Sequence, residues 1–175
     1  MSSYITTSSK IHFTPVSPDP EQIVIRDIAH ALSMMTRANG HFPEFYSVGQ
    51  HCIHCYEEAV ARKYSPFLCR ACLLHDASEA YLADITRPVK QFLPGYLEIE
   101  KRLQDTIYEK FLGRVPTEAE QTAISSVDDT LLYYEFDHYM GEKLQKKPPK
   151  LYSAPVFEQK PFSGIEEKYI LFSQS

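Results

Sequence analysis

Apolar residues recur every three or four positions over most of the chain, in stretches that end at proline or glycine. This is the period at which an α-helix presents one face to a core, so the chain is expected to fold as packed helices. The expected helices run from Asp27 to before Gly40, from Ser47 through Ala59, from Ser65 to about Leu82, from Leu97 to Phe111, from Thr117 through Tyr134 and from Ser163 through Phe172. With a short helical turn between Pro88 and Pro94, the sequence predicts an all-α bundle of five to seven helices.

Helix start signals support several of these boundaries. Asp27, Ser47 and the pair Ser65-Pro66 are residue types that cap a helix or open its first turn. Thr117 and Ser163 each precede a glutamate by three residues, which is the capping-box pattern. We therefore expect helices to begin at these five points.

The length of 175 residues suits one domain, expected to span residues 1–175. At its start, two β-prone runs between Tyr4 and Phe13 flank Ser8-Ser9-Lys10 and predict a short β-hairpin. The 18 Lys and Arg against 23 Asp and Glu give a net charge of −5, so duplex nucleic acid is not an expected partner.

The sequence also predicts the subcellular localisation of the protein. No run approaches the roughly 20 apolar residues that a membrane helix needs, and Met1-Ser2-Ser3-Tyr4 does not begin a secretory signal. Four cysteines without an export signal are typical of reduced thiols, which predicts a cytoplasmic protein.

The pair His75-Asp76 follows Leu73 and Leu74 directly, in a stretch expected to be the middle of a helix. Ionisable groups behind core leucines are costly unless they are paired or bind a metal ion. Adjacent helical residues differ by about 100° around the axis, so both side chains could reach one ion. Glu79 follows His75 by four residues, one helical turn, where its carboxylate would lie beside that ion.

Two further ligands have candidates on separate expected helices. His51 begins the helix that follows Tyr46, and Asp128 borders the apolar stripe made by Val127 and Leu131. Two imidazoles and two carboxylates suit one divalent ion such as Mn²⁺, Co²⁺, Fe²⁺, Zn²⁺ or Ni²⁺. The alternative is a core ion pair without any metal.

These residues, in this order, resemble the H…HD…D pattern of the HD-domain metal-dependent phosphohydrolases. Longer stretches resemble the 5′-deoxynucleotidase-like branch of that superfamily, with phage dATP triphosphohydrolases as near relatives. The matching stretches are 27–33, Arg37, 46–51, 74–79 and 83–90. The resemblance covers about residues 20–140.

The resemblance implies a helical bundle around one divalent ion that hydrolyses a phosphate ester of a deoxynucleotide, commonly as a homodimer. The metal ligands would be His51, His75, Asp76 and Asp128. Glu79 would act on the attacking water and Asp84 would also be needed for catalysis. The residues expected to contact the substrate are Arg37, Lys90, Arg87 and Tyr46, although Arg87 could equally be a surface cation in a turn.

The resemblance has one clear departure. Members that act on monophosphates carry a tryptophan after the arginine, whereas here Ala38 follows Arg37 and the chain has no tryptophan. Phe42, Phe45 or Tyr46 would then stack on the base. The expected substrate is a (deoxy)nucleoside 5′-monophosphate. The alternatives are a dNTP triphosphohydrolase that releases tripolyphosphate, another phosphoester or cyclic nucleotide, and a nucleotide-binding protein without turnover.

Other candidate ligands are more simply explained by structure. Cys52-x-x-Cys55 and Cys69-x-x-Cys72 have the spacing of a four-thiolate zinc site, but both pairs fall on apolar helical stripes where buried cysteine packs as a small hydrophobe. His54 is expected to pack rather than to ligate, and Asp128 is preferred to Asp129 as the last ligand.

Overall fold

The computed structural model describes residues 3–175 and is an all-α bundle with a short β-hairpin at its start, as the periodicity predicted. Within these residues the elements, in chain order, are β1 (Ile5–Thr6), β2 (His12–Phe13), η1 (Pro20–Gln22), α1 (Ile25–Met34), η2 (Arg37–Gly40), α2 (Val48–Ala61), α3 (Pro66–Leu74), η3 (Ala77–Ala80), α4 (Arg87–Lys90), α5 (Pro94–Leu112), α6 (Glu118–Met140) and α7 (Phe162–Ser173), where η marks a short 3-10 helix. None of the helices among residues 3–175 combines the length and the apolar character that crossing a membrane requires.

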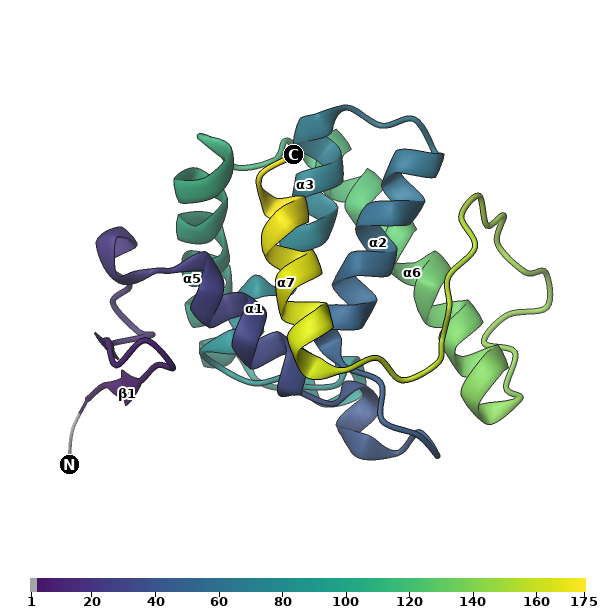
Figure 1. Cartoon of the computed structure of the whole chain (residues 1–175), viewed down its shortest axis with the longest axis horizontal. Helices are drawn as coiled ribbons and strands as arrows, with labels where there is room; N and C mark the ends of the chain where they lie inside the picture. The colour runs from purple at the N-terminus through teal and green to yellow at the C-terminus, as the bar shows by residue number, and fades with distance from the viewer. Residues whose placement is uncertain (1–2) are drawn as a thin grey trace.

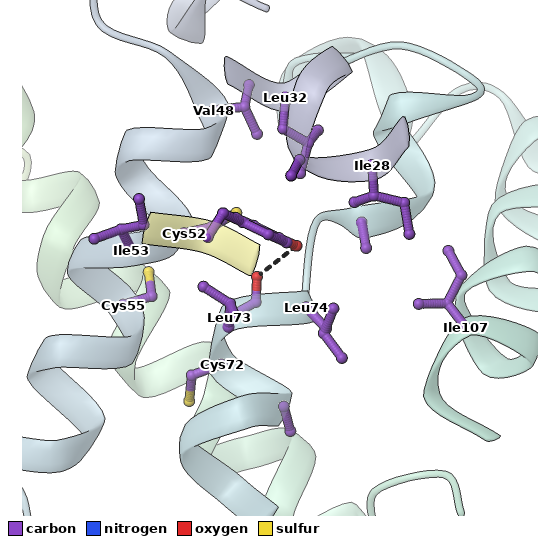
Figure 2. Close-up of a cluster of buried hydrophobic side chains, with 14 of the residues drawn as sticks. Ile28, Leu32, Val48, Cys52, Ile53, Cys55, Cys72, Leu73, Leu74 and Ile107 are labelled. Carbon is purple, nitrogen blue, oxygen red and sulfur yellow. Dashed lines mark hydrogen bonds between the residues drawn. The ribbon is translucent and has the colours of Figure 1, made fainter. Parts of the chain in front are cut away.

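The middle of the bundle is formed by α2 and α3, which pack against each other (Figure 1). Helix α7 lies over them and packs on α1, while α6 packs against the other side of α2 and α3. Figure 2 shows the core between these helices, where Cys52, Cys55 and Cys72 lie among Val48, Leu73 and other apolar side chains. All four cysteines are free and buried, as expected for thiols on apolar helical stripes.

The hairpin pairs β1 with β2 in antiparallel register, with Ile5 opposite Phe13, which is fully buried. Asp27 ties this hairpin to α1, because its carboxylate accepts hydrogen bonds from Ser8 Oγ at 3.0 Å and from Ser9 N at 2.8 Å. The prediction that Asp27 is an N-cap is therefore wrong. Helix α1 begins two residues earlier, after Val24, which makes no side-chain cap.

The capping signals of the later helices have mixed outcomes. Ser47, Ser65 and Thr117 all cap their helices with side-chain hydrogen bonds, and Thr117 forms the full capping box with Glu120. Ser163 does not, since α7 already begins at Phe162 and its N-cap position is Pro161 without a side-chain bond.

Helix α3 ends at Leu74 rather than continuing to Leu82, so the prediction that His75 and Asp76 lie mid-helix is wrong. The cause is Gln104 on α5. Its Nε2 donates to Leu74 O at 2.8 Å, and its Oε1 accepts from Ser78 N at 3.1 Å. These two backbone groups are the ones that a continuing helix would join to each other. A side chain from α5 thus replaces that hydrogen bond and opens the chain after His75.

Candidate metal centre

Three separate segments bring the four predicted ligands together. His51 lies in the first turn of α2, whose start is held by Ser47, and Gly49 before it allows α1 to approach closely. His75 and Asp76 lie immediately after the end of α3, and Asp128 lies in the middle of α6. Residues far apart in the sequence therefore meet at one point.

The donor atoms of these ligands are separated by metal-like distances. His51 Nε2 lies 3.3 Å from His75 Nε2 and 3.2 Å from Asp128 Oδ1, and His75 Nε2 lies 3.2 Å from Asp76 Oδ2. The two remaining histidine–aspartate separations are both 3.8 Å. Bonds of about 2.0–2.2 Å to one ion would separate neighbouring donors by roughly 3.0–3.5 Å. The four side chains are thus arranged around a common point.

The other nitrogen of each imidazole is already committed. His75 Nδ1 donates to the carbonyl oxygen of Cys72 at 2.9 Å, and His51 Nδ1 lies 2.5 Å from Glu135 Oε1. Because a carbonyl or an ionised carboxylate only accepts, each Nδ1 carries a hydrogen. In the neutral rings both Nε2 lone pairs then face each other and the two aspartates. This is the arrangement of histidines that ligate a metal and donate their second N–H behind it.

The ionisation of the two aspartates also favours a bound cation. Although burial alone would raise the pKa of Asp76, His75 and Arg37 lower it well below its usual value, so Asp76 is ionised. Asp128 is ionised for the same reason, since hydrogen bonds with His51 and His75 outweigh burial and lower its pKa. Burial opposes protonation of His75, yet the two aspartates raise its pKa well above the ordinary value. The acids therefore attract positive charge to this point, whether protons or an ion.

The structure contains buried groups that could hold a metal ion. There are two such sets, and within each set the donor atoms lie within 4.8 Å of one another. Both sets include a cysteine that was expected to pack in the core. One set is His51, Cys55 and His75, and the other is Cys52, His75 and Asp76. Cys69 belongs to neither set, so within residues 3–175 the four cysteines do not form the four-thiolate site that their spacing resembles.

Glu135, which no sequence pattern singled out, is fully buried behind His51. Although burial alone would raise its pKa, His51 and Arg37 lower the pKa of Glu135 to about 2. Its carboxylate accepts from His51, from Arg37 Nη2 at 3.3 Å and from Tyr46 Oη at 3.0 Å. The available signal was its place on α6, seven residues or two turns after Asp128, which puts both on one face.

Arg37 and Tyr46, which the resemblance assigned to substrate, both lie close against the cluster. The Arg37 side chain is 11% exposed and contacts Asp76 as well as Glu135. Tyr46 is fully buried, and its hydroxyl also lies 2.9 Å from His54 Nδ1. Burial lowers the pKa of His54 to about 4, so this ring is neutral and supports Tyr46 instead of joining the cluster.

A cavity of about 870 Å³ opens beside the donors, between α5 and α6. His75, Asp76 and Asp128 line it on the side of the cluster, and Glu79 and Lys90 line it further out. Of the residues expected to contact the substrate, Lys90 lines the cavity, while Arg37, Tyr46 and Arg87 do not.

Glu79 is buried at the edge of this cavity. Its Oε1 lies 3.6 Å from Lys90 Nζ, while its Oε2 has no hydrogen-bond partner among residues 3–175. Burial first, and then the charges of Asp76 and Asp84, raise the pKa of Glu79 well above its ordinary value. Glu79 is therefore a carboxyl group that takes up a proton readily, close to the proposed ligands.

Asp84 and Arg87 lie on the segment that follows η3. Asp84 is half-buried, and its pKa is raised mainly by burial, with the opposing charges of Arg37 and Lys90 nearby. Arg87 is 60% exposed and pairs with Asp128 Oδ2 at 2.5 Å and Asp129 Oδ1 at 2.6 Å. Of the two neighbouring aspartates, Asp128 reaches the histidines, while Asp129 lies on the exposed side with Arg87.

Comparison of the sequence with known proteins finds relatives of this chain. None of the protein-family models matches the sequence. The uncharacterized protein YfdR of Escherichia coli (strain K12) is 39% identical over 109 residues, which are 62% of this chain and 58% of YfdR. The uncharacterized protein RCAP_rcc00048 of Rhodobacter capsulatus is 35% identical over 133 residues, 72% of this chain and 67% of the relative. The chain belongs to the RCAP_rcc00048 family.

Membership of the RCAP_rcc00048 family does not by itself name a reaction, because neither relative's name states one. The chain also spans only 58% of the length of YfdR. What the site of this family member can do must therefore be argued from its own residues.

Proposed function

We propose that the protein is an HD-domain phosphohydrolase that hydrolyses the phosphate ester of (deoxy)nucleoside 5′-monophosphates with one divalent metal ion. The proposal is carried by one observation: the Nε2 atoms of His51 and His75 lie 3.2–3.8 Å from each other and from both aspartates, with both Nδ1 atoms committed elsewhere. The resemblance of the same four residues to the HD pattern supports it.

The residues present fit a divalent ion. With an ion in place they would be two neutral imidazoles and two ionised carboxylates, and Glu79 Oε2 beside them is a buried oxygen without a partner in the described chain. Such a nitrogen and oxygen set suits Mn²⁺, Fe²⁺, Co²⁺, Ni²⁺ or Zn²⁺. A divalent ion held by His51, His75, Asp76 and Asp128 would supply positive charge that polarises a phosphoryl oxygen and lowers the pKa of water.

Glu79 is proposed as the general base. It lines the cavity beside Asp76, is not one of the four ligands, and has one oxygen free of hydrogen bonds within the described residues. A carboxylate with a raised pKa accepts a proton from attacking water more readily than an exposed one does. This role also argues against a nucleotide-binding protein without turnover, because a simple binding site has no use for such a group.

Lys90, Arg37 and Asp84 are proposed to prepare the phosphate site. Lys90 is the cation of the cavity wall nearest to Glu79, and it can turn from Glu100, 2.7 Å away, toward a phosphate oxygen. Arg37 forms an ion pair with Asp76 and so places a positive charge next to the acids. Asp84 adds a half-buried carboxylate that is influenced by the charges of Arg37 and Lys90.

The charges of the cavity wall favour a substrate with one phosphate over a triphosphate. Among its lining residues are six acids, namely Asp76, Glu79, Glu100, Asp105, Glu118 and Asp128. The lining also contains two lysines, Lys90 and Lys101, and both are already paired with acids in the described chain. A triphosphate tail would bring more negative charge to this wall than a single phosphate, and apart from Lys90 it would meet only Lys101 among the lining cations of the described chain. The triphosphohydrolase alternative is therefore less well supported.

The test is a nucleotide panel assayed with the Mn²⁺- or Co²⁺-loaded protein. We expect inorganic phosphate from dNMPs and little or no tripolyphosphate from dNTPs. Glu79→Gln should lose turnover and keep metal binding, whereas Ser163→Ala, a change at an exposed position of α7, should leave turnover intact. Absence of product from every nucleotide by a fully metal-loaded protein would contradict the proposal. Sedimentation of the same sample tests the expected homodimer.

A further inference from the structure

Cys55 differs from the other cysteines in what its sulfur faces. It follows His51 by four residues on α2, and its Sγ lies 3.4 Å from His51 Nε2. This is the ring nitrogen whose lone pair faces the aspartates, because Nδ1 is committed to Glu135. The donor atoms of Cys55, His51 and His75 all lie within 4.8 Å of one another. The side chain is 1% exposed.

Packing alone accounts for the other thiols better than for Cys55. Cys69 Sγ faces the carbonyl oxygen of Tyr64 at 3.6 Å, away from the cluster. Cys72 is fully buried in the core between α2 and α3 (Figure 2). Cys52 lies near His75 and Asp76, and burial raises the pKa of its thiol to about 11 against the opposing effect of a hydrogen bond with His75. Cys55 is the cysteine whose sulfur lies 3.4 Å from His51 Nε2, a nitrogen of the proposed centre.

We propose that Cys55 Sγ is a fifth ligand of the metal ion held by His51, His75, Asp76 and Asp128, so that the centre combines two nitrogens, two oxygens and one sulfur. The inference rests on the metal centre of the proposed function. Bonds of about 2.3 Å to sulfur and about 2.1 Å to nitrogen would separate the two donors by roughly 3.1–3.6 Å at the usual ligand angles. The observed 3.4 Å lies inside this range.

Cys55 would bind the ion from the core side. It is absent from the cavity lining, where His75, Asp76 and Asp128 appear, so a sulfur bond leaves the cavity side of the centre open to substrate. On binding, the S–H bond breaks, the sulfur keeps the electron pair and shares it with the ion, and the proton leaves to solvent. A soft sulfur donor would favour Zn²⁺, Fe²⁺ or Co²⁺ over Mn²⁺.

The experiment is a titration of the metal-free full-length protein with Co²⁺, followed by absorption spectroscopy. A thiolate ligand gives a charge-transfer band in the near ultraviolet, in addition to the weak visible bands of protein-bound Co²⁺. We expect this band in the wild type, its loss in Cys55→Ser with the visible bands kept, and its retention in Cys69→Ser and in Cys52→Ser.

Each other result overturns the inference in a recognisable way. Visible Co²⁺ bands without charge transfer in the wild type would leave the centre standing and remove Cys55 from it. Loss of the band in Cys52→Ser but not in Cys55→Ser would assign the sulfur to Cys52. Failure of the wild type to bind Co²⁺ at all would overturn the metal centre and the proposed function together.

X-ray absorption of the Zn²⁺-loaded wild type makes the test independent of any variant that does not fold. A sulfur neighbour at about 2.3 Å from zinc is expected in the wild type. A shell made only of nitrogen and oxygen would overturn the inference. Cys55→Ala, which removes the sulfur and adds no polar atom to the core, is the second variant for the same measurement.

Discussion

Two buried charged clusters lie two turns apart on α2, and they differ in how their charges are satisfied. At one, the Glu58 carboxylate is fully buried and accepts hydrogen bonds from Arg62 Nε at 2.8 Å and from Ser153 N and Oγ at 2.8 and 2.7 Å. The Tyr152 amide adds another at 3.1 Å. At the other, His51 meets a second imidazole and two carboxylates.

The difference separates a structural cluster from a candidate site. Glu58 finds all its donors in its own chain and ties the segment before α7 to α2, so nothing further is needed there. Around His51 the lone pairs and acids face one another, and Glu79 Oε2 has no partner in the described chain. Polar groups that are brought together and left without donors indicate a ligand from outside the chain.

The largest expected effect is on the His51 side. Asp76→Asn should lower phosphohydrolase kcat/KM by on the order of 10³-fold, about 4 kcal/mol, because an uncharged amide is a weak metal ligand. The free energy of unfolding without metal should also fall, because His75 and Arg37 lower the pKa of Asp76 and its charge therefore stabilises the fold. Steady-state kinetics and urea unfolding check both parts. Unchanged kinetics would remove Asp76 from the centre.

Glu79→Gln is expected to lower kcat by roughly 10²–10³-fold, the usual contribution of a general base. The amide has nearly the same size but does not take up a proton. Calorimetry should find metal affinity unchanged, because Glu79 is not among the four ligands. An equal loss of metal affinity would instead make Glu79 a ligand and not the base.

On the Glu58 side the expected effect is on stability. Glu58→Gln should destabilise the fold by about 2–3 kcal/mol, because it breaks charged hydrogen bonds to Arg62 and to the backbone of Ser153. Metal binding per folded molecule should remain unchanged. Urea unfolding and calorimetry on the same sample separate the two. A loss of metal binding without a loss of stability would erase the contrast between the clusters.

The difference in stability between the wild type and Glu58→Gln should depend on pH. Burial alone would raise its pKa, but hydrogen bonds from Ser153 and Arg62 outweigh it and lower the pKa below the ordinary value of 4.5. A carboxyl group with a lowered folded-state pKa stabilises the fold above its unfolded-state pKa and loses this contribution as the pH falls through the folded-state pKa. The stability advantage of wild type over Glu58→Gln should therefore be full at pH 7 and shrink below about pH 4.5. An advantage that grows in acid would contradict this sign.

The smallest effect concerns how closely α1 approaches the start of α2. A Cβ at Gly49 would lie 3.0 Å from Ser33 N and 3.1 Å from the carbonyl carbon of Leu32, whereas Gly95 has nothing within 4 Å. Gly49→Ala should destabilise by about 1–2 kcal/mol, and Gly95→Ala should stabilise by about 0.5–1 kcal/mol through helix propensity. Thermal unfolding of both variants provides the check. Equal shifts would mean that the contact at Gly49 is not tight.

Much of the fold could be predicted because its signals are local. Ser47, Ser65 and Thr117 cap the helices that their neighbours predicted, and the apolar period placed α2, α5 and α6. The end of α3 could not be predicted, since it depends on Gln104, a polar side chain thirty residues later that separates Leu74 O from Ser78 N. Local propensity contains no information about such a contact.

Some residues of the site could likewise be predicted from the sequence, and others could not. The residue types of His51, His75, Asp76 and Asp128 carried the hypothesis of a common ion, and they do lie together. Glu135 was missed because a glutamate on a long helix looks like a surface residue until its partners are known. For Arg87 the sequence left a phosphate contact and a surface cation equally open, and in the structure Arg87 pairs with Asp128 and Asp129.

Calorimetric titration of the metal-free protein with Co²⁺ or Mn²⁺ tests most directly whether the four-residue centre holds an ion. We expect one ion per chain in the wild type, no saturable binding in Asp76→Asn, and wild-type stoichiometry in Glu58→Gln. A wild type that binds no ion, or an Asp76→Asn variant that binds as well as the wild type, would contradict the metal centre.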